Sequence, residues 1–339
     1  MPLPRCRFAA LALPALLVFP AAASAEPFKD KVITGVHAHA SQIKGTTQMY
    51  PTGDGSISIP VTLASTYTGD PAVAQTYATF LGTLPHGPEL ASLKVTVVPS
   101  SEVATDCGGQ PSDGILACYG DSDQTMIVPG DQAAGSDISV DYVITHEYGH
   151  HIAAHRSNAP LNALDFGPKR WSSYELVCAN TLDGKLAPAD EGVNYLSNPG
   201  EAWAEAYARL VFPTEAWRFT PLLKPTQGSA LAAMADITQP WTKRVTTTFT
   251  GSDTKTFTLP LTLDGAFTLK LDGPATANYD LIVRSGGKVE DRTTRPGSQD
   301  SINYKIACRD RRTENLKITV IRRSGGTAGP YTLTAKYAG

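Results

Sequence analysis

The chain has 339 residues, of which 29 are lysine or arginine and 32 are aspartate or glutamate, so its formal net charge at pH 7 is −3. This weakly acidic balance excludes the basic surface that nucleic-acid-binding proteins usually carry, and no nucleic-acid partner is expected. A chain of this length is too long for one typical hydrophobic core, so we expect two domains.

The first 25 residues have the pattern of a secretory signal peptide. Arg5 and Arg7 precede an apolar run over residues 8–20, and the small-residue sequence Ala-Ser-Ala ends at Ala25. A membrane anchor is the alternative, but the run is short and interrupted by proline. No later stretch is apolar enough to span a bilayer, so we expect a secreted mature chain, extracellular or periplasmic, without a membrane span.

Residues 26–67 have no pattern that assigns them a structure. They are a short propeptide, a layer of strands or a part of the domain that follows, and the sequence leaves these alternatives open. Beyond them, apolar residues at helical spacing predict a helix over 70–84. Two β-rich runs that end in proline predict short strands at 93–99 and 125–130.

The most informative motif lies in the next helix, for which Ser136 or Ser139 is the expected N-cap. This helix contains the motif His-Glu-x-x-His, and two stripes of residues along it predict that one side is buried and the other lines a cleft. His146 and His150 are four residues apart and project from one face, where two imidazoles bind one Zn²⁺. Glu147 then lies beside the metal.

A catalytic zinc ion takes three protein ligands and a water, so the motif requires a third ligand. A third histidine six residues after the second is excluded, because that position holds Arg156. The sequence NPGEAWAEAY predicts a helix capped by Asn198, with Glu201 and Glu205 one turn apart on one face. The alternative is that both acids are structural. The metal's requirement favours Glu201 as a ligand and Glu205 as the acid that orients a histidine ligand.

HEYGH followed by NPGEAWAEAY resembles the gluzincin metallopeptidases, whose zinc ligands are the two motif histidines and the first acid of a Glu-x-x-x-Asp/Glu helix. The resemblance implies an α+β zincin-like catalytic domain over residues 68–242. It also implies that His146, His150 and Glu201 bind Zn²⁺ and that Glu147 is the catalytic base.

Near residue 242 the composition of the chain changes. Beyond this point, short runs of Thr, Val, Leu and Tyr are separated by Gly, Asp and Pro. Eight of these runs are strand candidates with regular spacing, which predicts an antiparallel β-sandwich over residues 243–339. Through NYDLIVRSGG and GGTAGPYTLTAKY, this part resembles the pre-peptidase C-terminal domain common on secreted bacterial proteases. Binding to a surface or a polymer is one expected role for it.

The cysteines indicate an oxidising compartment. Cys6 leaves with the signal peptide, and the remaining four are expected to form two disulfides, for which three pairings exist. We favour Cys107 with Cys118, because they flank a short turn-rich stretch, which leaves Cys178 with Cys308. Four zinc-binding thiolates are the alternative, but the chain has no CxxC spacing.

The expected function is that of a secreted zinc endopeptidase, with a protein or peptide as substrate, in which Glu147 activates a zinc-bound water. Tyr195 is the candidate that stabilises the oxyanion, with a packed core tyrosine as an equal alternative. His151 points away from the ligand face and is expected to be a buried, hydrogen-bonded residue or a surface residue.

Two alternative functions stay open. The first is a secreted, non-catalytic binding protein whose metal is structural, and the second is a zinc amidase that acts on cell-wall peptides. Glu147 favours catalysis, because a structural site gains nothing from a base. An open water position indicates a catalytic site, whereas a fourth protein ligand indicates a structural one.

Overall fold

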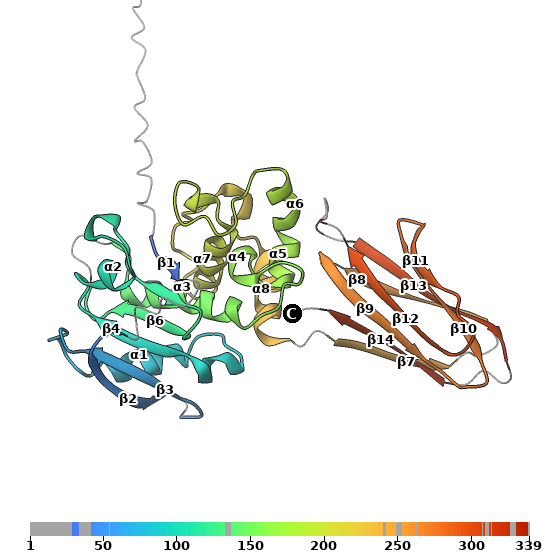
Figure 1. Cartoon of the computed structure of the whole chain (residues 1–339), viewed down its shortest axis with the longest axis horizontal. Coiled ribbons are helices and arrows are strands. Elements are labelled where there is room, and N and C mark those ends of the chain that lie inside the picture. Colours follow the sequence, from blue (N-terminus) through green and yellow to red (C-terminus); the bar gives the residue numbers. More distant parts are fainter. Residues whose placement is uncertain are drawn as a thin grey trace, which may run out of the picture.

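A computed structural model of the chain describes residues 29–33, 42–53, 55–132, 137–239, 242–248, 253–261, 264–306, 308, 312, 314–325 and 330–337. The expected signal peptide and the alternative cap Ser136 lie outside the described residues. Figure 1 shows a mixed α/β part, which ends with helix α8 (Gln227–Thr238), and an all-β part, which begins with strand β7 (Thr242–Thr248). This division agrees with the expected α+β domain followed by a β-sandwich.

A six-stranded sheet with the order β1-β5-β6-β4-β3-β2 forms the first layer of the α/β part. Its strands are β1 (Lys31–Ile33), β2 (Gly45–Pro51), β3 (Ser58–Ala64), β4 (Lys94–Val98), β5 (Cys118–Gly120) and β6 (Thr125–Pro129). Strands β3, β4 and β6 are parallel to one another, whereas β2 is antiparallel to β3 and β5 is antiparallel to β6. Strands β4 and β6 are almost completely buried, which explains their continuous apolar runs and confirms the two strands predicted there.

The unassigned segment 26–67 therefore contributes strands to this sheet. Strands β2 and β3 pair over seven residues and join the sheet through β4. Strand β1 is different, because it has three half-buried residues and pairs with the edge strand β5 in parallel. Strands β2 and β3 are thus part of the same sheet as β4 and β6, while residues 29–33 are an addition to its edge.

Helices cover this sheet and separate it from the all-β part (Figure 1). They are α1 (Val73–Leu81), α2 (Val103–Asp106), α3 (Val140–Ala154), α4 (Ala163–Phe166), α5 (Lys169–Tyr174), α6 (Val177–Leu182), α7 (Pro199–Val211) and α8. Short 3₁₀ turns lie at Pro88–Ser92, Pro111–Asp113, Tyr195–Ser197 and Pro221–Leu223. Helix α1 confirms the helix predicted over 70–84, and it packs on β2 and β3, whereas α3 packs on β5 and β6.

Local capping signals fix where the two long helices begin. The hydroxyl of Ser139 accepts a hydrogen bond from the backbone N–H of Tyr142 at 3.2 Å, so Ser139 caps α3. The side chain of Asn198 accepts from the N–H of Gly200 at 3.0 Å, and Pro199 takes the first helical position of α7. Both helix starts agree with the sequence prediction. Helix α3 is buried on all sides from Tyr142 to Ala153, so the expectation that one of its faces lines an open cleft is wrong.

Helices α3 and α7 cross at very short range, and a glycine makes this possible. A Cβ atom added to Gly149 would lie 2.8 Å from the Cα of Ala204, closer than any side chain tolerates without a shift. At the same point the indole N–H of Trp203 donates to the carbonyl of Gly149 at 2.8 Å. The Gly of HEYGH therefore lets α7 approach the face of α3 that carries the two histidines.

The all-β part consists of two antiparallel four-stranded sheets, β11-β10-β13-β8 and β12-β9-β14-β7. The remaining strands are β8 (Thr254–Leu261), β9 (Gly265–Asp272), β10 (Asn278–Ser285), β11 (Lys288–Thr293), β12 (Gln299–Ile306), β13 (Glu314–Ser324) and β14 (Pro330–Tyr337). Side chains from both sheets form one buried core, with Leu281 and Ile318 from the first and Leu269 and Leu333 from the second. The eight predicted strands and the sandwich are confirmed.

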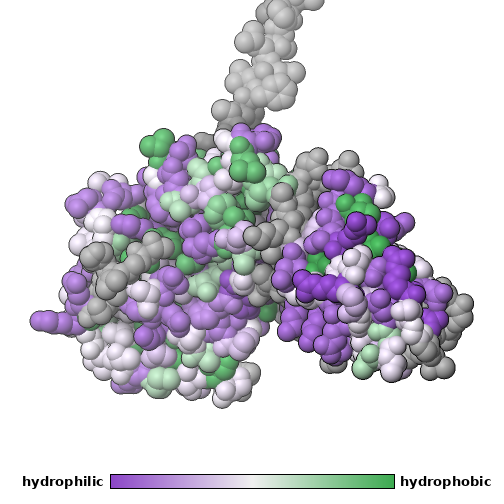
Figure 2. All heavy atoms as spheres, turned by 45° about the vertical axis from the view of Figure 1, so that its right-hand side comes forward, coloured by the Kyte–Doolittle hydropathy of each residue, from purple (hydrophilic) through white to green (hydrophobic). Residues whose placement is uncertain are grey.

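Two disulfides cross-link the chain, Cys107 with Cys118 and Cys178 with Cys308, as the sequence favoured. The second one connects α6 to the all-β part. The ammonium of Lys169 reinforces this connection, because it donates hydrogen bonds to three carbonyls. Those of Asn158 and Ala159 lie in the α/β part, and that of Asp264 lies in the all-β part. On the face in Figure 2 the two parts form separate lobes, with hydrophilic and hydrophobic residues mixed on both. No helix within the described ranges is long and apolar enough to cross a membrane.

Candidate metal centre

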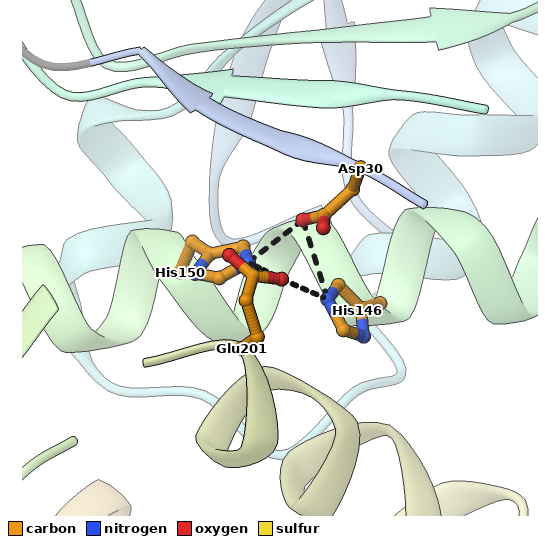
Figure 3. Close-up of side chains that lie close together, drawn as sticks. All are labelled: Asp30, His146, His150 and Glu201. Carbon is orange, nitrogen blue, oxygen red and sulfur yellow. Dashed lines mark hydrogen bonds and ion pairs between the residues drawn. The ribbon is translucent and has the colours of Figure 1, made fainter. Parts of the chain in front are cut away.

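Four ionisable side chains meet in the buried interior of the α/β part, and Figure 3 shows that they point toward one another. His146 and His150 come from α3, Glu201 comes from the first turn of α7, and Asp30 directly precedes β1. One ligand atom from each residue lies within 4.8 Å of all the others. The structure thus brings together the three ligands suggested by the sequence and adds a fourth.

Most of the distances between these atoms match the spacing of ligands around a tetrahedral metal ion. Asp30 Oδ2 lies 2.9 Å from His150 Nε2 and 3.3 Å from His146 Nε2. Glu201 Oε2 lies 3.4 Å from His146 Nε2 and 3.5 Å from His150 Nε2. Nitrogen and oxygen ligands of zinc lie about 2.0–2.2 Å from the metal, which places tetrahedral ligands roughly 3.3–3.5 Å apart. Three of the four distances fall within or at the limit of this range.

The electrostatics of the cluster require positive charge at its centre. Burial lowers the pKa of His150, but Glu201 and Asp30 raise it more, to about 10. Burial also opposes ionisation of Asp30, yet His146 and His150 hold the pKa of this carboxyl well below its usual value. An ionised Asp30 is stable at this depth only beside a cation, which is either a protonated imidazole or a metal ion that displaces the proton.

Glu205 lies one turn beyond Glu201 and faces the other nitrogen of a ligand histidine. Its Oε2 is 3.4 Å from Nδ1 of His146, and its Oε1 accepts from Nη1 of Arg218 at 3.2 Å. A carboxylate at Nδ1 places the imidazole proton there and leaves the Nε2 lone pair directed at the other three ligand atoms. This is the arrangement expected for Glu205 as the acid that orients a histidine.

Glu147 is fully buried beside the cluster, and neither of its oxygens has a hydrogen-bond partner within the described part of the chain. Burial raises its pKa well above the usual glutamate value, and the charges of Asp30 and Glu201 raise it further. Buried polar atoms without a partner are rare in folded proteins and indicate a missing water, ion or reactant.

Tyr195 lies in the same site. Its hydroxyl donates to Oδ1 of Asp30 and also contacts Oε2 of Glu201 at 3.1 Å. Burial raises its pKa well above the ordinary tyrosine value, and Asp30 adds to this effect, so the hydroxyl keeps its proton. Tyr195 is therefore a buried donor that is aimed at the ligand carboxylates.

His151 is not a ligand. Its Nε2 lies 2.9 Å from the carbonyl of Glu89, and the hydroxyl of Tyr119 lies 3.1 Å from its Nδ1. Burial lowers its pKa to about 4, so the ring is neutral, with Nε2 as donor and Nδ1 as acceptor. Of the two alternatives expected for His151, a buried hydrogen-bonded residue and a surface residue, the structure shows the first.

Asp30 is the site residue that the sequence did not indicate. It is a single acid between two lysines, in a segment without helical or strand periodicity, and 116 positions before His146. The one indication of it is that a tetrahedral metal needs a fourth donor. A water can be that donor as well, so this indication does not single out Asp30. In the structure the carboxylate of Asp30 is the fourth candidate donor of the cluster.

No protein-family model matches the chain, and no curated protein matches it. Among solved structures, similarity is found to a periplasmic inhibitor of g-type lysozyme from Aeromonas hydrophila (PliG), with 18% identity over 29% of this chain and 86% of that chain and a TM-score of 0.21.

Two further solved structures are similar over the same share of this chain. The pre-peptidase C-terminal domain of a Bacillus anthracis collagenase has 12% identity over 29% of this chain and 90% of that chain, with a TM-score of 0.22. A family two carbohydrate esterase from Cellvibrio japonicus has 12% identity over 29% of this chain and 34% of that chain, with a TM-score of 0.17. Likenesses at these scores assign neither a fold family nor a function.

Proposed function

We propose that the protein is a secreted zinc endopeptidase of the zincin-like class, in which His146, His150 and Glu201 bind Zn²⁺. The two imidazoles and a carboxylate are a ligand set that catalytic zinc takes, and the distances between their atoms fit its bond lengths. The two disulfides support an oxidising compartment, extracellular or periplasmic.

The unpartnered carboxylate of Glu147 carries this proposal. An ionised carboxylate that is buried without partners costs several kcal/mol, and a purely structural metal site has no use for it. A cation in the adjacent cluster lowers this cost and returns Glu147 to its ionised, proton-accepting form.

The chemistry follows from the positions of three groups. Zinc supplies a Lewis acid and a bound water of lowered pKa when it is present. Glu147 accepts a proton from the attacking water and delivers it to the leaving amine of the peptide. The hydroxyl of Tyr195 is a buried donor at the ligand carboxylates, from where it stabilises the oxyanion once Asp30 no longer holds it.

A structural metal site is the second candidate, and one observation favours it. Asp30 completes a set of four protein ligands, which is typical of zinc sites that stabilise a fold. In that case the protein binds a partner or a polymer through its β-sandwich. The unpaired Glu147 favours the endopeptidase, because a structural metal site gains nothing from a buried base beside it.

Peptide hydrolysis tests the proposal, with zinc-loaded wild type and Asp30→Ala assayed on casein, a peptide library and purified cell-wall peptides. Glu147→Gln, in whichever background is more active, should lower the rate about 100-fold or more without loss of zinc. Glu215→Gln, which removes a half-exposed carboxylate elsewhere, is the control. The proposal fails if neither background cleaves any peptide, and cleavage of cell-wall peptides alone replaces it with the amidase.

A further inference from the structure

The geometry points to Asp30 as a displaceable fourth ligand, carried on a short edge strand that closes the metal site and holds the enzyme in a latent form. This inference rests on the proposed function, because it assigns a regulatory element to the same site. It concerns residues 29–33, which the structure describes, and the two groups that this segment blocks.

Asp30 occupies both positions that hydrolysis needs. Its Oδ2 lies 2.9 Å and 3.3 Å from Nε2 of His150 and His146, so it takes the coordination position that a catalytic water requires. Its Oδ1 accepts the hydroxyl proton of Tyr195, so the candidate oxyanion donor is also engaged. One carboxylate thus blocks the nucleophile and the donor together.

The segment that carries Asp30 joins the sheet through one short strand at its edge. Among the described strands β1 pairs with β5 alone, over three residues that are half-buried. Beyond this ladder, Lys29 O accepts from Leu116 N at 2.9 Å and Ile33 O accepts from Asp121 N at 3.2 Å. Asp30 N donates to the hydroxyl of Tyr195 at 3.3 Å, and Lys31 Nζ donates to the carbonyl of Gly108 at 3.1 Å. If β1 leaves, the five strands from β5 to β2 keep all their pairings. A terminal edge strand of this size opens at low free energy compared with the core.

A cavity beside the ligands shows what the segment covers. Its volume is about 350 Å³, and residues 29–31 line it together with Glu191 and Tyr195. Departure of β1 therefore joins this cavity to the metal ligands and frees the edge of β5 at the same time. A buried site becomes one that an extended peptide can enter.

The alternative to a displaceable ligand is a permanent one, and the two make opposite predictions for Asp30→Ala. A permanent ligand is part of the structural metal site, so its loss releases the metal. A displaceable one leaves three ligands, which hold catalytic zinc without help. Its loss exposes a coordination position to small molecules from solvent.

The test uses the full mature chain loaded with Co²⁺ and a titration with acetohydroxamate, a small metal-chelating probe, followed in the visible spectrum of the ion. The variants are Asp30→Ala and the isosteric Asp30→Asn. The control is Lys29→Ala, which changes an exposed side chain one position away and keeps the backbone bond to Leu116. Circular dichroism verifies that each variant is folded.

We expect one metal ion per chain in all four proteins, with acetohydroxamate binding at least about tenfold tighter to both Asp30 variants than to wild type and Lys29→Ala. The factor follows because a site that is open in about a tenth of the molecules or fewer loses affinity in the same proportion. Equal binding of the probe by wild type and the variants overturns the inference. Loss of the metal from both folded Asp30 variants overturns it as well.

Peptide hydrolysis measured on the same proteins separates this inference from the proposed function. Tighter probe binding with faster peptide cleavage supports both. Tighter probe binding without any cleavage supports the displaceable ligand and contradicts the endopeptidase.

Discussion

Replacement of Glu205 by glutamine tests whether α7 supplies a metal ligand and also the group that orients another. The change keeps the shape of the side chain but removes the charge that faces Nδ1 of His146 at 3.4 Å. Loss of such a partner typically lowers metal affinity about 10- to 100-fold, because the ring orientation and the basicity of Nε2 are no longer fixed. This range corresponds to about 1.4–2.7 kcal/mol of binding free energy.

The matched control for this prediction is Glu215→Gln. Glu205 and Glu215 both pair with Arg218, at 3.2 Å and 3.3 Å, but the side chain of Glu215 is 40% exposed and that of Glu205 is fully buried. Zinc affinity is measured by competition with a chromophoric chelator, and thermal unfolding of the metal-free proteins reports any loss of fold. We expect wild-type affinity for Glu215→Gln. Unchanged affinity in Glu205→Gln, or equal losses in both variants, would refute the reasoning.

Three further predictions concern the framework around the site, and urea unfolding checks each of them. Cys107→Ser combined with Cys118→Ser should lower the free energy of unfolding by about 3 kcal/mol, because the disulfide closes a short loop with a sequence separation of 11 residues; an unchanged midpoint contradicts this. Lys169→Met should cost about 3 kcal/mol, since it leaves three carbonyls without their donor; a neutral effect means that water replaces the ammonium. Burial raises the pKa of Glu89, but a backbone N–H and the guanidinium of Arg156 lower it more, so its folded-state pKa lies below the ordinary glutamate value of 4.5. The stability advantage of wild type over Glu89→Gln should therefore be constant above that value and shrink as the pH falls below it; a difference that grows in acid has the wrong sign.

The parts of the site that the sequence predicted are those with local signals. Ser139 and Asn198 cap their helices through side chains adjacent in sequence, and the spacing of His146 and His150 alone places them on one face. The eight strands of the sandwich are likewise visible as local runs. Such features depend on a few neighbouring residues, so a single sequence specifies them.

Other features depend on contacts between distant segments, and no local pattern carries them. Asp30 reaches the cluster because β1 adds to the edge of β5, and neither three-residue strand has a recognisable periodicity. The burial of α3 from Tyr142 to Ala153 has no local signal for a similar reason. Its polar residues predict a helix face that lines a cleft. In the structure α7 and the other residues of the metal cluster pack over that face. In the sequence, Gly149 is a residue of low helix propensity. Its role becomes clear only from the position of Ala204, which packs against it.

The central claim is that HEYGH and the first acid of α7 form one zinc site. A crystal structure of the zinc-loaded protein, with anomalous data collected at the zinc edge, tests it most directly. The account predicts one anomalous peak about 2.0–2.2 Å from Nε2 of His146, Nε2 of His150 and a carboxylate oxygen of Glu201. No peak at these residues, or a peak that Glu201 does not reach, would contradict it.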